Sequence, residues 1–412
     1  MASSGSESAL DVLRARGFVQ QISDEAELGK RLAAGSTTFY AGFDPTAASL
    51  HVGSMIPLMA MAHLTRAGHR PIAVLGGGTT MVGDPSGKTE LRKMLTWETI
   101  CDNRRGIEPQ VRRFLGDGDN VVVVDNGDWL MPLNYIAFLR DIGRHFSVNR
   151  MLAAEAYKLR LEKGLSFIEF NYQLLQAYDF LVLNERYGCA LQIGGDDQWG
   201  NIVAGIDLIR RVRQVESFGL TFPLLTTASG AKMGKTAAGA VWLDARLTTP
   251  YDFYQYFVNV DDRDVIKFLK LLTFENLGEI ARYAALAGAE LREAKHALAH
   301  GVTSIVHGVQ AANEARDAAK AAFGGAGADD ASVPTFSVEA AQASSGIKIV
   351  DLLASCGLAA SRSAARRLIE QGGVRFGERK VASIEESITA SDIGGGIMLY
   401  AGKKNLRRIT VA

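Results

Sequence analysis

Short apolar runs separated by helix-like segments dominate the first 200 residues, and they constrain the fold more than any other feature of the chain. The runs lie at residues 37–42, 71–75, 121–124 and 190–193. Each one ends at, or is followed by, glycine or aspartate. Fully apolar strands that alternate with helices predict a parallel sheet covered on both faces. Ligands bind such α/β sheets beyond the carboxyl ends of the strands, so the residues that follow these runs form the candidate site.

The composition bounds the class of protein. A chain of 412 residues is long enough for roughly two to four domains. No apolar run reaches the length of a bilayer span, and the first residues lack the pattern of a secretory signal. The three cysteines have neither metal-ligand nor redox spacing, which indicates a reducing compartment and no structural zinc. We therefore expect a cytoplasmic protein that does not enter a membrane and has no metal site of its own.

The organisation changes after the first 250 residues, where the strand pattern disappears. Amphipathic patterns at 261–272 and 289–310 indicate a small helical domain. A glycine-rich, acidic stretch begins at residue 324, and we expect a linker that extends to residue 344. Residues 345–412 carry 11 Lys and Arg against 6 Asp and Glu, a net charge of +5 in a chain whose total is zero. A localised basic module on a neutral protein indicates an anionic partner.

Within this basic module, Ser361 is a candidate N-cap of a helix, and a turn between two short strands follows the helix. Five basic residues of the helix and the hairpin are candidate RNA contacts: Arg362, Arg366, Arg367, Arg375 and Lys380. A solvated basic helix would explain the helix alone. The helix, the basic hairpin and their position after a linker together favour RNA, and they resemble an RNA-binding module first known from a ribosomal small-subunit protein.

Two pairs of residues nearly two hundred positions apart indicate the chemistry. His51 and Gly53 follow Tyr40-Ala41-Gly42-Phe43-Asp44-Pro45-Thr46, and the second pair lies in Lys232-Met233-Gly234-Lys235-Thr236. Between them lie Gly83-Asp84-Pro85-Ser86-Gly87-Lys88 and Gly194-Gly195-Asp196-Asp197-Gln198-Trp199. In this order the motifs resemble those of a class I aminoacyl-tRNA synthetase. The likeness is greatest to bacterial-type tyrosyl-tRNA synthetase, and it covers nearly the whole chain.

The resemblance implies a tyrosine–tRNA ligase. Such an enzyme activates L-tyrosine with ATP, which gives tyrosyl-adenylate and pyrophosphate, and it then transfers the tyrosyl group to the 3′-terminal adenosine of tRNA(Tyr). Mg²⁺ would enter with ATP. The resemblance also implies a homodimer, with residues 143–170 in the contact.

The implied domains are a Rossmann-like catalytic domain (1–225), the lysine loop with an α-helical anticodon-stem domain (226–323), the linker (324–344) and a small α+β RNA-binding domain (345–412).

Activation of an amino acid needs donors for the ATP phosphates rather than a protein nucleophile. Donors at a helix start, and lysines on a glycine-punctuated loop, suit charge that develops in the transition state. The expected catalytic donors are Thr46, His51, Lys88, Arg92, Lys232 and Lys235. The expected ATP contacts are Gly42, Asp44, His51, Gly53, Ser54, Gly195, Asp197 and Lys235.

The amino acid pocket is the most discriminating part of the pattern. Tyr172, Gln176 and Asp179 are spaced as neighbours on one face of a helix that is otherwise apolar. By the resemblance, Tyr40 and Asp179 bond the substrate's phenol hydroxyl, Gln198 approaches the carboxylate side, and the ammonium group is surrounded by Asp84, Asn126, Tyr172 and Gln176. A site that bonds a hydroxyl rejects the analogue that lacks it, and tyrosine enzymes of this class are the standard example.

Two positions depart from the family pattern. Ser54 stands where a second histidine or an asparagine is usual, so its contact with the nucleotide is weakened or water-mediated. Asp196 stands where serine is usual. Two alternatives remain open for this extra carboxylate, since it either points away from ATP or helps to hold magnesium.

Three rival functions are less well supported. A tryptophan enzyme of the same class would share the signatures, but Tyr40, Asp179 and the basic module argue against it. An RNA-binding relative without activation activity is favoured only by Ser54 and Asp196. A P-loop NTPase needs four residues between its glycines, whereas the stretch 83–87 has three.

Overall fold

The computed structural model describes residues 8–86, 94–153, 157–158, 161, 164–228, 230, 233–236, 239–323, 335–402 and 405–412. The chain forms two compact units. The first comprises residues 1–233, 242–244 and 261–294, and the second comprises 234–241, 245–260 and 295–412. No helix within the described ranges is long and apolar enough to cross a membrane.

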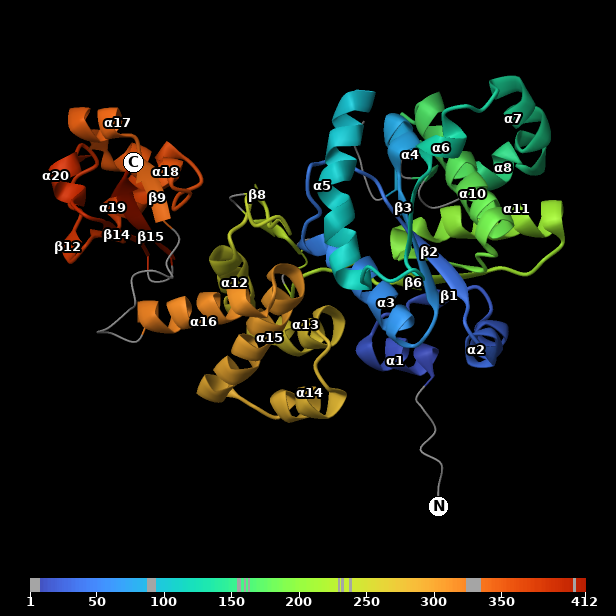
Figure 1. Ribbon diagram of the computed structural model, residues 1–412, viewed down its shortest axis with the longest axis horizontal. Coiled ribbons are helices and arrows are strands. Elements are labelled where there is room, and N and C mark those ends of the chain that lie inside the picture. Colours follow the sequence, from blue (N-terminus) through green and yellow to red (C-terminus); the bar gives the residue numbers. More distant parts are fainter. Residues whose placement is uncertain are drawn as a thin grey trace, which may run out of the picture. The chain divides into compact units, whose positions relative to one another are not determined.

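The first unit is built on a six-stranded sheet with the order β1-β6-β5-β2-β3-β4, and helices cover both of its faces (Figure 1). Neighbouring strands run parallel, except that β1 pairs antiparallel with β6 at the edge. The strands are β1 (Gln21–Ile22), β2 (Thr38–Phe43), β3 (Arg70–Leu75), β4 (Val122–Asp125), β5 (Leu191–Gly195) and β6 (Phe218–Phe222). The α/β class that the apolar runs predict is therefore confirmed.

Most helices of the first unit lie between these strands in the sequence, whereas α1 precedes β1 and α13 and α14 follow β6. They are α1 (Ala9–Arg16), α2 (Glu25–Ala34), α3 (Met55–Arg66), α4 (Gly77–Val82), α5 (Trp97–Leu115), α6 (Gly127–Leu130), α7 (Tyr135–Asp141), α8 (Val148–Leu152), α10 (Phe167–Tyr187), α11 (Trp199–Arg213), α13 (Val265–Leu272) and α14 (Leu277–Ala284). Short 3₁₀ turns lie at η1 (Val52–Ser54), η2 (Gly143–His145), η3 (Asp196–Gln198), η4 (Asp262–Asp264) and η5 (Gly288–Glu290).

Helix α10 positions much of the site, and its sequence explains why it does so. Ser166 and Glu169 form a capping box at its start, and Gly188 ends it in the left-handed conformation. Phe180 and Leu183 are fully buried and belong to the core cluster that includes Tyr40 of β2. The polar residues at positions 172, 176 and 179 therefore face the carboxyl ends of the strands, where a ligand would bind.

The second unit contains helices and the C-terminal module. Its elements are β7 (Lys235–Thr236), β8 (Gly239–Ala240), α12 (Pro250–Val258), most of α15 (Leu291–His307), α16 (Val309–Phe323), β9 (Thr335–Val338), α17 (Ala340–Ser345), β10 (Ile347–Lys348), α18 (Ile349–Ser355), α19 (Arg362–Glu370), β11 (Val374–Phe376), β12 (Arg379–Lys380), β13 (Ser387–Ile388), α20 (Ala390–Ile393), β14 (Ile397–Ala401) and β15 (Asn405–Val411).

Three boundaries differ from those expected. The helix expected at 289–310 breaks at Gly308, which adopts a positive φ of 94°. The expected linker 324–344 ends early, because β9 pairs in parallel with β15 and α17 follows it; residues 324–334 lie outside the described ranges. Residues 261–294 belong to the first unit rather than to a separate helical domain.

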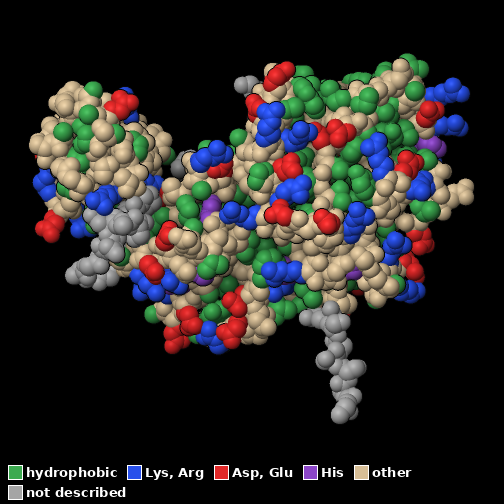
Figure 2. Space-filling model, viewed as in Figure 1, with side chains coloured by type: hydrophobic (Ala, Val, Ile, Leu, Met, Phe, Trp, Pro, Cys, Tyr) green, Lys and Arg blue, Asp and Glu red, His purple; other side chains and the backbone are tan. Residues whose placement is uncertain are grey.

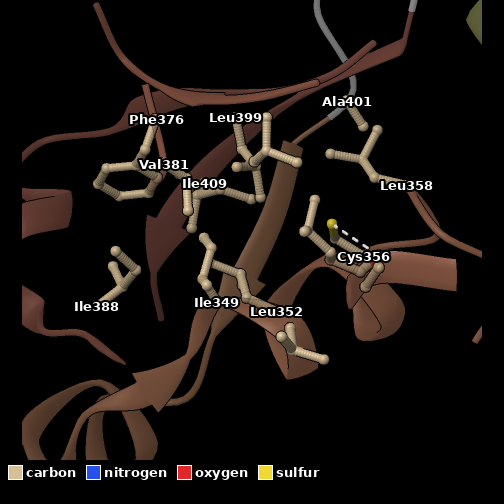
Figure 3. Packing of buried hydrophobic residues seen from close by; sticks show 14 of the residues in the cluster. Ile349, Leu352, Cys356, Leu358, Phe376, Val381, Ile388, Leu399, Ala401 and Ile409 are labelled. Carbon is tan, nitrogen blue, oxygen red and sulfur yellow. Dashed lines mark hydrogen bonds between the residues drawn. The ribbon is translucent and has the colours of Figure 1, made fainter. Parts of the chain in front are cut away.

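The C-terminal module has its own hydrophobic core. Five strands in the order β12-β11-β14-β15-β9 form one sheet, and β10 pairs with β13 beside it. Ile349 and Leu352 of α18 pack with Phe376, Leu399 and Ile409 of the sheet (Figure 3). The predicted hairpin is present, since Arg375 pairs with Lys380 across the β11–β12 turn.

Arg16 explains why α13 packs with the first unit. This last residue of α1 is buried, and its guanidinium donates to three carbonyl oxygens at the end of α13, those of Lys270, Thr273 and Glu275, at 3.2, 3.0 and 2.7 Å. The last carbonyls of a helix have no partner within it, so a buried helix end needs such a donor. The Arg16 side chain therefore joins α1, near the start of the first unit's sequence, to α13, near its end.

We predict that Arg16→Met lowers the free energy of unfolding by roughly 2–4 kcal/mol, because it leaves buried carbonyl groups without donors. Denaturant unfolding followed by circular dichroism measures the change. Arg14→Met on the same helix is the control. It removes an exposed ion pair with Glu25 and should cost at most about 1 kcal/mol. Equal effects of the two substitutions would contradict the anchoring role of Arg16.

Candidate active site

A cavity of about 210 Å³ opens at the carboxyl ends of the parallel strands. Strands β2, β3 and β5 and helix α10 supply most of its wall, and Asn126 follows β4. The sequence-predicted residues in this wall are Tyr40, Gly42, Asp44, Asp84, Asn126, Tyr172, Gln176, Asp179, Gly195 and Gln198. The structure thus brings together residues that are separated by more than 150 positions.

The carboxylate of Asp179 is a buried polar group in the cavity wall. One oxygen accepts from Nδ2 of Asn126 at 2.8 Å, and the other accepts from Nε1 of Trp129 at 2.7 Å. Burial raises the pKa of this carboxyl from 3.8 to about 7, although both hydrogen bonds favour the charged form. Asp179 therefore takes part in a proton equilibrium near neutral pH.

Tyr40 lies in the same part of the wall and is 2% exposed. Among the described residues its hydroxyl has no hydrogen-bond partner, although it lines the cavity. Burial and the charge of Asp179 raise the pKa of Tyr40 well above its usual value, so the hydroxyl remains a neutral donor. A buried polar atom without a partner is costly unless a ligand completes it.

A second network lines the cavity nearer to β2. The hydroxyl of Tyr172 donates to Oδ2 of Asp44 at 3.2 Å, and the hydroxyl of Thr79 donates to Oδ1 of the same carboxylate at 2.9 Å. Nδ2 of Asn126 donates to the hydroxyl of Thr79 at 3.0 Å. These bonds connect helix α4 and helix α10 through one carboxylate at the end of β2.

The amide of Asn126 is fully used in this arrangement. Nδ2 donates to Thr79 and to Asp179, and Oδ1 accepts from the backbone N–H groups of Gly78 and Thr79. The sequence-based expectation that Asn126 faces a substrate ammonium group stays a prediction, since Asn126 lines the cavity while its amide already bonds Thr79 and Asp179. Its position supports Asp179.

Asp84 and Gln198 form the opposite polar edge. Oδ2 of Asp84 accepts from Nε2 of Gln198 at 2.8 Å, and Oδ1 accepts from the backbone N–H of Ser86 at 2.9 Å. Asn201 of α11 donates to the side-chain oxygens of both Gln176 and Gln198, at 3.0 and 3.2 Å. Asp84, Gln176 and Gln198 all line the cavity, and the carboxylate among them suits a cationic ligand group.

Three consecutive glycines bring the start of α4 close to the site. A Cβ atom at Gly76 would collide with the Asp44 carboxylate, and one at Gly77 would collide with the carboxylate of Asp125. At Gly78 it would lie 2.9 Å from Cβ of Leu130. Asp125 is itself fixed by an ion pair with Arg104 and by the N–H groups of Gly77 and Gly127. Of these glycines Gly76 lines the cavity, so backbone forms part of the wall here.

The histidine motif lies at the start of α3. His51 forms an isolated antiparallel bridge with Trp242, and the N–H of Leu243 donates to the carbonyl of Leu50 at 2.9 Å. A Cβ atom at Gly53 would lie 2.8 Å from the His51 ring, so a side chain there would displace the imidazole. Thr46 is exposed, Ser54 is half-buried, and Asp197 lies in η3.

Several expected donors cannot be placed. Lys88, Arg92 and Lys232 lie outside the described residues, and Lys235 is described only as part of β7. The five expected RNA contacts, in contrast, all have exposed side chains. Arg362 pairs with Asp351 at 2.6 Å, and the guanidinium of Arg375 lies 4.4 Å from the centre of the Tyr400 ring.

Comparison with known proteins identifies the family. Residues 32–324 match the class I tRNA synthetases for tryptophan and tyrosine, and residues 327–407 match the C-terminal domain of tyrosine–tRNA ligases. The chain belongs to this synthetase family. The family that the histidine and lysine motifs indicated is thereby confirmed.

Individual relatives agree with this assignment. The tyrosine–tRNA ligase of Desulfosudis oleivorans is 52% identical over 428 aligned positions, which cover 98% of this chain and 99% of the relative. That of Clostridium beijerinckii is 52% identical over 404 positions, with 98% and 99% coverage. Among solved structures, a C-terminally truncated mitochondrial tyrosyl-tRNA synthetase of Aspergillus nidulans superposes with a TM-score of 0.69 at 29% identity, and the match covers 76% of this chain and 93% of that chain.

Sequence reasoning about this synthetase site missed Thr79, Trp129, Gln192 and Asn201. Gln192 carried a usable signal, since it is a single polar residue in the apolar run 190–193. It pairs in register with Tyr40, is buried, and lines the cavity. Trp129 carried no such signal, because its role depends on one indole N–H that meets Asp179.

The raised pKa of Asp179 generates a prediction about stability. The unfolded chain releases this proton near pH 3.8, whereas the folded protein keeps it until about pH 7. Between these two pH values the native state binds one proton more than the unfolded chain. The stabilisation that this proton gives is therefore complete below about pH 3.8, and it is lost as the pH rises through about 7. Asp179→Asn cannot ionise. Its stability relative to the wild type should therefore improve as the pH is raised from about 5 to about 8.

Unfolding free energies of both proteins across this pH range provide the measurement. A constant difference between wild type and variant would show that Asp179 does not titrate in this window.

Proposed function

We propose that the cavity activates L-tyrosine with ATP, and that the protein then transfers the tyrosyl group to the 3′-terminal adenosine of tRNA(Tyr). The proposal of tyrosine as the amino acid rests on one pair of residues, Tyr40 and Asp179. A buried hydroxyl that can donate lies beside a buried carboxylate that can accept. A phenol hydroxyl satisfies both, because it accepts from Tyr40 and donates to Asp179. The relatives from Desulfosudis oleivorans and Clostridium beijerinckii are tyrosine–tRNA ligases.

The other end of the cavity suits the amino acid's charged groups. Asp84, with Tyr172 and Gln176, would receive the ammonium group, and Gln198 would lie toward the carboxylate. In this orientation the carboxylate points to the glycines at the end of β5 and to the start of α3. ATP would bind there, with Gly42, Asp44, His51, Gly53, Ser54, Gly195 and Asp197 as its contacts.

Catalysis would rest on donors rather than on a nucleophile. Thr46 and His51, together with Lys88, Arg92, Lys232 and Lys235, would stabilise the charge that builds on the phosphates as pyrophosphate leaves. Mg²⁺ would enter with the ATP phosphates, which are hard oxygen ligands. The reaction would take place in the cytoplasm, where ATP and tRNA are available.

The second step needs the end of the tRNA beside the adenylate. We assign a contact with another part of the tRNA to the C-terminal module, whose exposed basic residues are Arg362, Arg366, Arg367, Arg375 and Lys380.

Exchange of pyrophosphate into ATP tests the proposed activation step. Tyrosine should support exchange without tRNA, whereas phenylalanine and tryptophan should not. Tyr40→Phe should reduce the preference for tyrosine over phenylalanine by about 10-fold, the effect of one lost hydrogen bond. The same variant should be at least as stable as the wild type without ligand, because the hydroxyl it removes has no partner among the described residues.

Tyr251→Phe is the control, since it removes the hydroxyl of a buried tyrosine that does not line the cavity. It should leave the exchange reaction unchanged. Exchange with tryptophan in place of tyrosine would refute the assignment of Tyr40 and Asp179. If no amino acid supported exchange while the folded protein still bound tRNA, the protein would be an RNA-binding relative.

We further propose that the protein is a homodimer through an apolar patch on the first unit. The patch consists of the exposed residues Met131, Tyr135, Ile136, Val148, Phe167 and Ile168. Hydrophobic side chains gather over the region of α6 and α7 (Figure 2). Phe167 and Ile136 are both 70% exposed. A contiguous apolar surface of this kind marks an interface, and a symmetric pair of chains covers it with itself.

The wild type should show twice the chain mass of 44.3 kDa by light scattering, and Phe167→Asp should shift it toward one chain mass, because the interface would contain an unpaired charge. Val309→Asp is the matched control, since Val309 is 62% exposed and lies outside the patch. A wild type of one chain mass would refute the dimer. If Val309→Asp were also a monomer, the effect of Phe167→Asp would not be specific to the patch.

A further inference from the structure

Asp196, which replaces the usual serine, does not face the cavity. It begins the 3₁₀ turn η3 directly after β5. Its Oδ1 accepts from Nε2 of Gln21 at 2.6 Å and from the hydroxyl of Thr221 at 3.1 Å. Gly195 before it and Gln198 two positions after it line the cavity, whereas Asp196 and Asp197 do not. The sequence left two alternatives open for Asp196. The geometry favours the one in which its carboxylate points away from ATP.

The two partners of Asp196 belong to the edge of the sheet. Gln21 lies on β1, Thr221 lies on β6, and these two residues are paired in register. Thr221 is fully buried, and its hydroxyl donates a hydrogen bond to the Asp196 carboxylate. The backbone N–H of Gln20 also donates to the carbonyl of Thr221, at 2.8 Å. One carboxylate oxygen therefore ties the turn after β5 to the edge strand β1 and to its neighbour β6.

This turn presents three groups to the proposed ATP and tyrosine sites. Gly195 lies in the cavity wall, and the carboxylate of Asp197 lies against it, since a Cβ atom on Gly195 would be 2.7 Å from Oδ1 of Asp197. Gln198 donates to Asp84. Because η3 contains only three residues, the direction of Asp196 fixes the backbone from which Asp197 and Gln198 project.

We propose that Asp196 is a positioning residue for nucleotide binding, and that Gln21 is its partner on the edge strand. The inference rests on the proposed function. Asp196 acts by accepting hydrogen bonds and makes no contact with ATP. Its charge is not required, because both bonds go to a single oxygen that an asparagine side chain also provides.

The experiment compares Asp196→Ala, Asp196→Asn, Gln21→Ala and the double variant Asp196→Ala/Gln21→Ala in tyrosine-dependent pyrophosphate exchange. Gln20→Ala is the matched control, because Gln20 precedes Gln21 and its side chain is exposed. The KM for ATP, the KM for tyrosine and kcat are determined for each. Calorimetry measures the Kd for ATP in parallel, so the comparison does not depend on turnover.

Asp196→Ala should raise the KM and the Kd for ATP by about 5- to 20-fold, while the KM for tyrosine changes by less than about 2-fold. Gln21→Ala should produce part of this rise, and the double variant should not exceed Asp196→Ala, since both substitutions break the same tie. Asp196→Asn should restore ATP affinity to within about 3-fold of the wild type. Gln20→Ala should behave as the wild type.

Other outcomes overturn the proposal. Unchanged ATP affinity in Asp196→Ala, with or without a lower melting temperature, would leave Asp196 with a structural role only. An Asp196→Asn variant as impaired as Asp196→Ala, or one with an altered Mg²⁺ dependence, would mean that the charge acts on the metal–nucleotide complex. A wild type that binds ATP but shows no exchange with tyrosine would count against the proposed function, while the calorimetric comparison of the variants would still decide the role of Asp196.

Discussion

The buried carboxylate of Asp179 is the constraint on which the site depends. Its two oxygens fix Asn126 after β4 and Trp129 on α6, and Asn126 in turn receives the N–H groups at the start of α4. Three elements from distant parts of the sequence thus converge on one acceptor. Its burial opposes ionisation, and these hydrogen bonds oppose that effect only in part. A further donor from a ligand would stabilise the charged form, so the group that supports the architecture is also the one that we propose to bond the substrate's hydroxyl.

The sheet and much of the cavity wall could be predicted from sequence because both follow from periodicity. The apolar runs at 71–75 and 121–124 became β3 and β4, and the spacing of Tyr172, Gln176 and Asp179 placed all three on the cavity side of α10. A helix or strand repeats its geometry, so spacing alone determines which residues share a face. The order of the motifs also helped to indicate the family, because it follows the order in which the strands occur along the chain.

The remaining parts of the site depend on single contacts between distant segments. The sequence does not show that Asn126 gives both amide hydrogens to Thr79 and Asp179, or that Asp196 turns toward Gln21. The packing of residues 261–294 also depends on a contact of this kind. A change in composition suggested that 261–294 belonged to a separate helical domain, but the guanidinium of Arg16 fixes α13 to the first unit. Composition indicates whether a segment prefers to be helix or strand. The element against which the segment packs depends on residues elsewhere in the chain.

The glycine wall at 76–78 has a consequence for redesign of the pocket. Each of these positions is pressed against a different neighbour, and two of those neighbours are carboxylates that belong to the hydrogen-bond networks of the site. Of the three glycines, Gly76 lines the cavity, and it has no side chain that could be trimmed to enlarge the pocket. A variant for a bulkier amino acid that gains its space from the polar residues of α10, from Gln192 or from Tyr40 alters polarity as well as volume. At these positions, size and selectivity cannot be tuned independently.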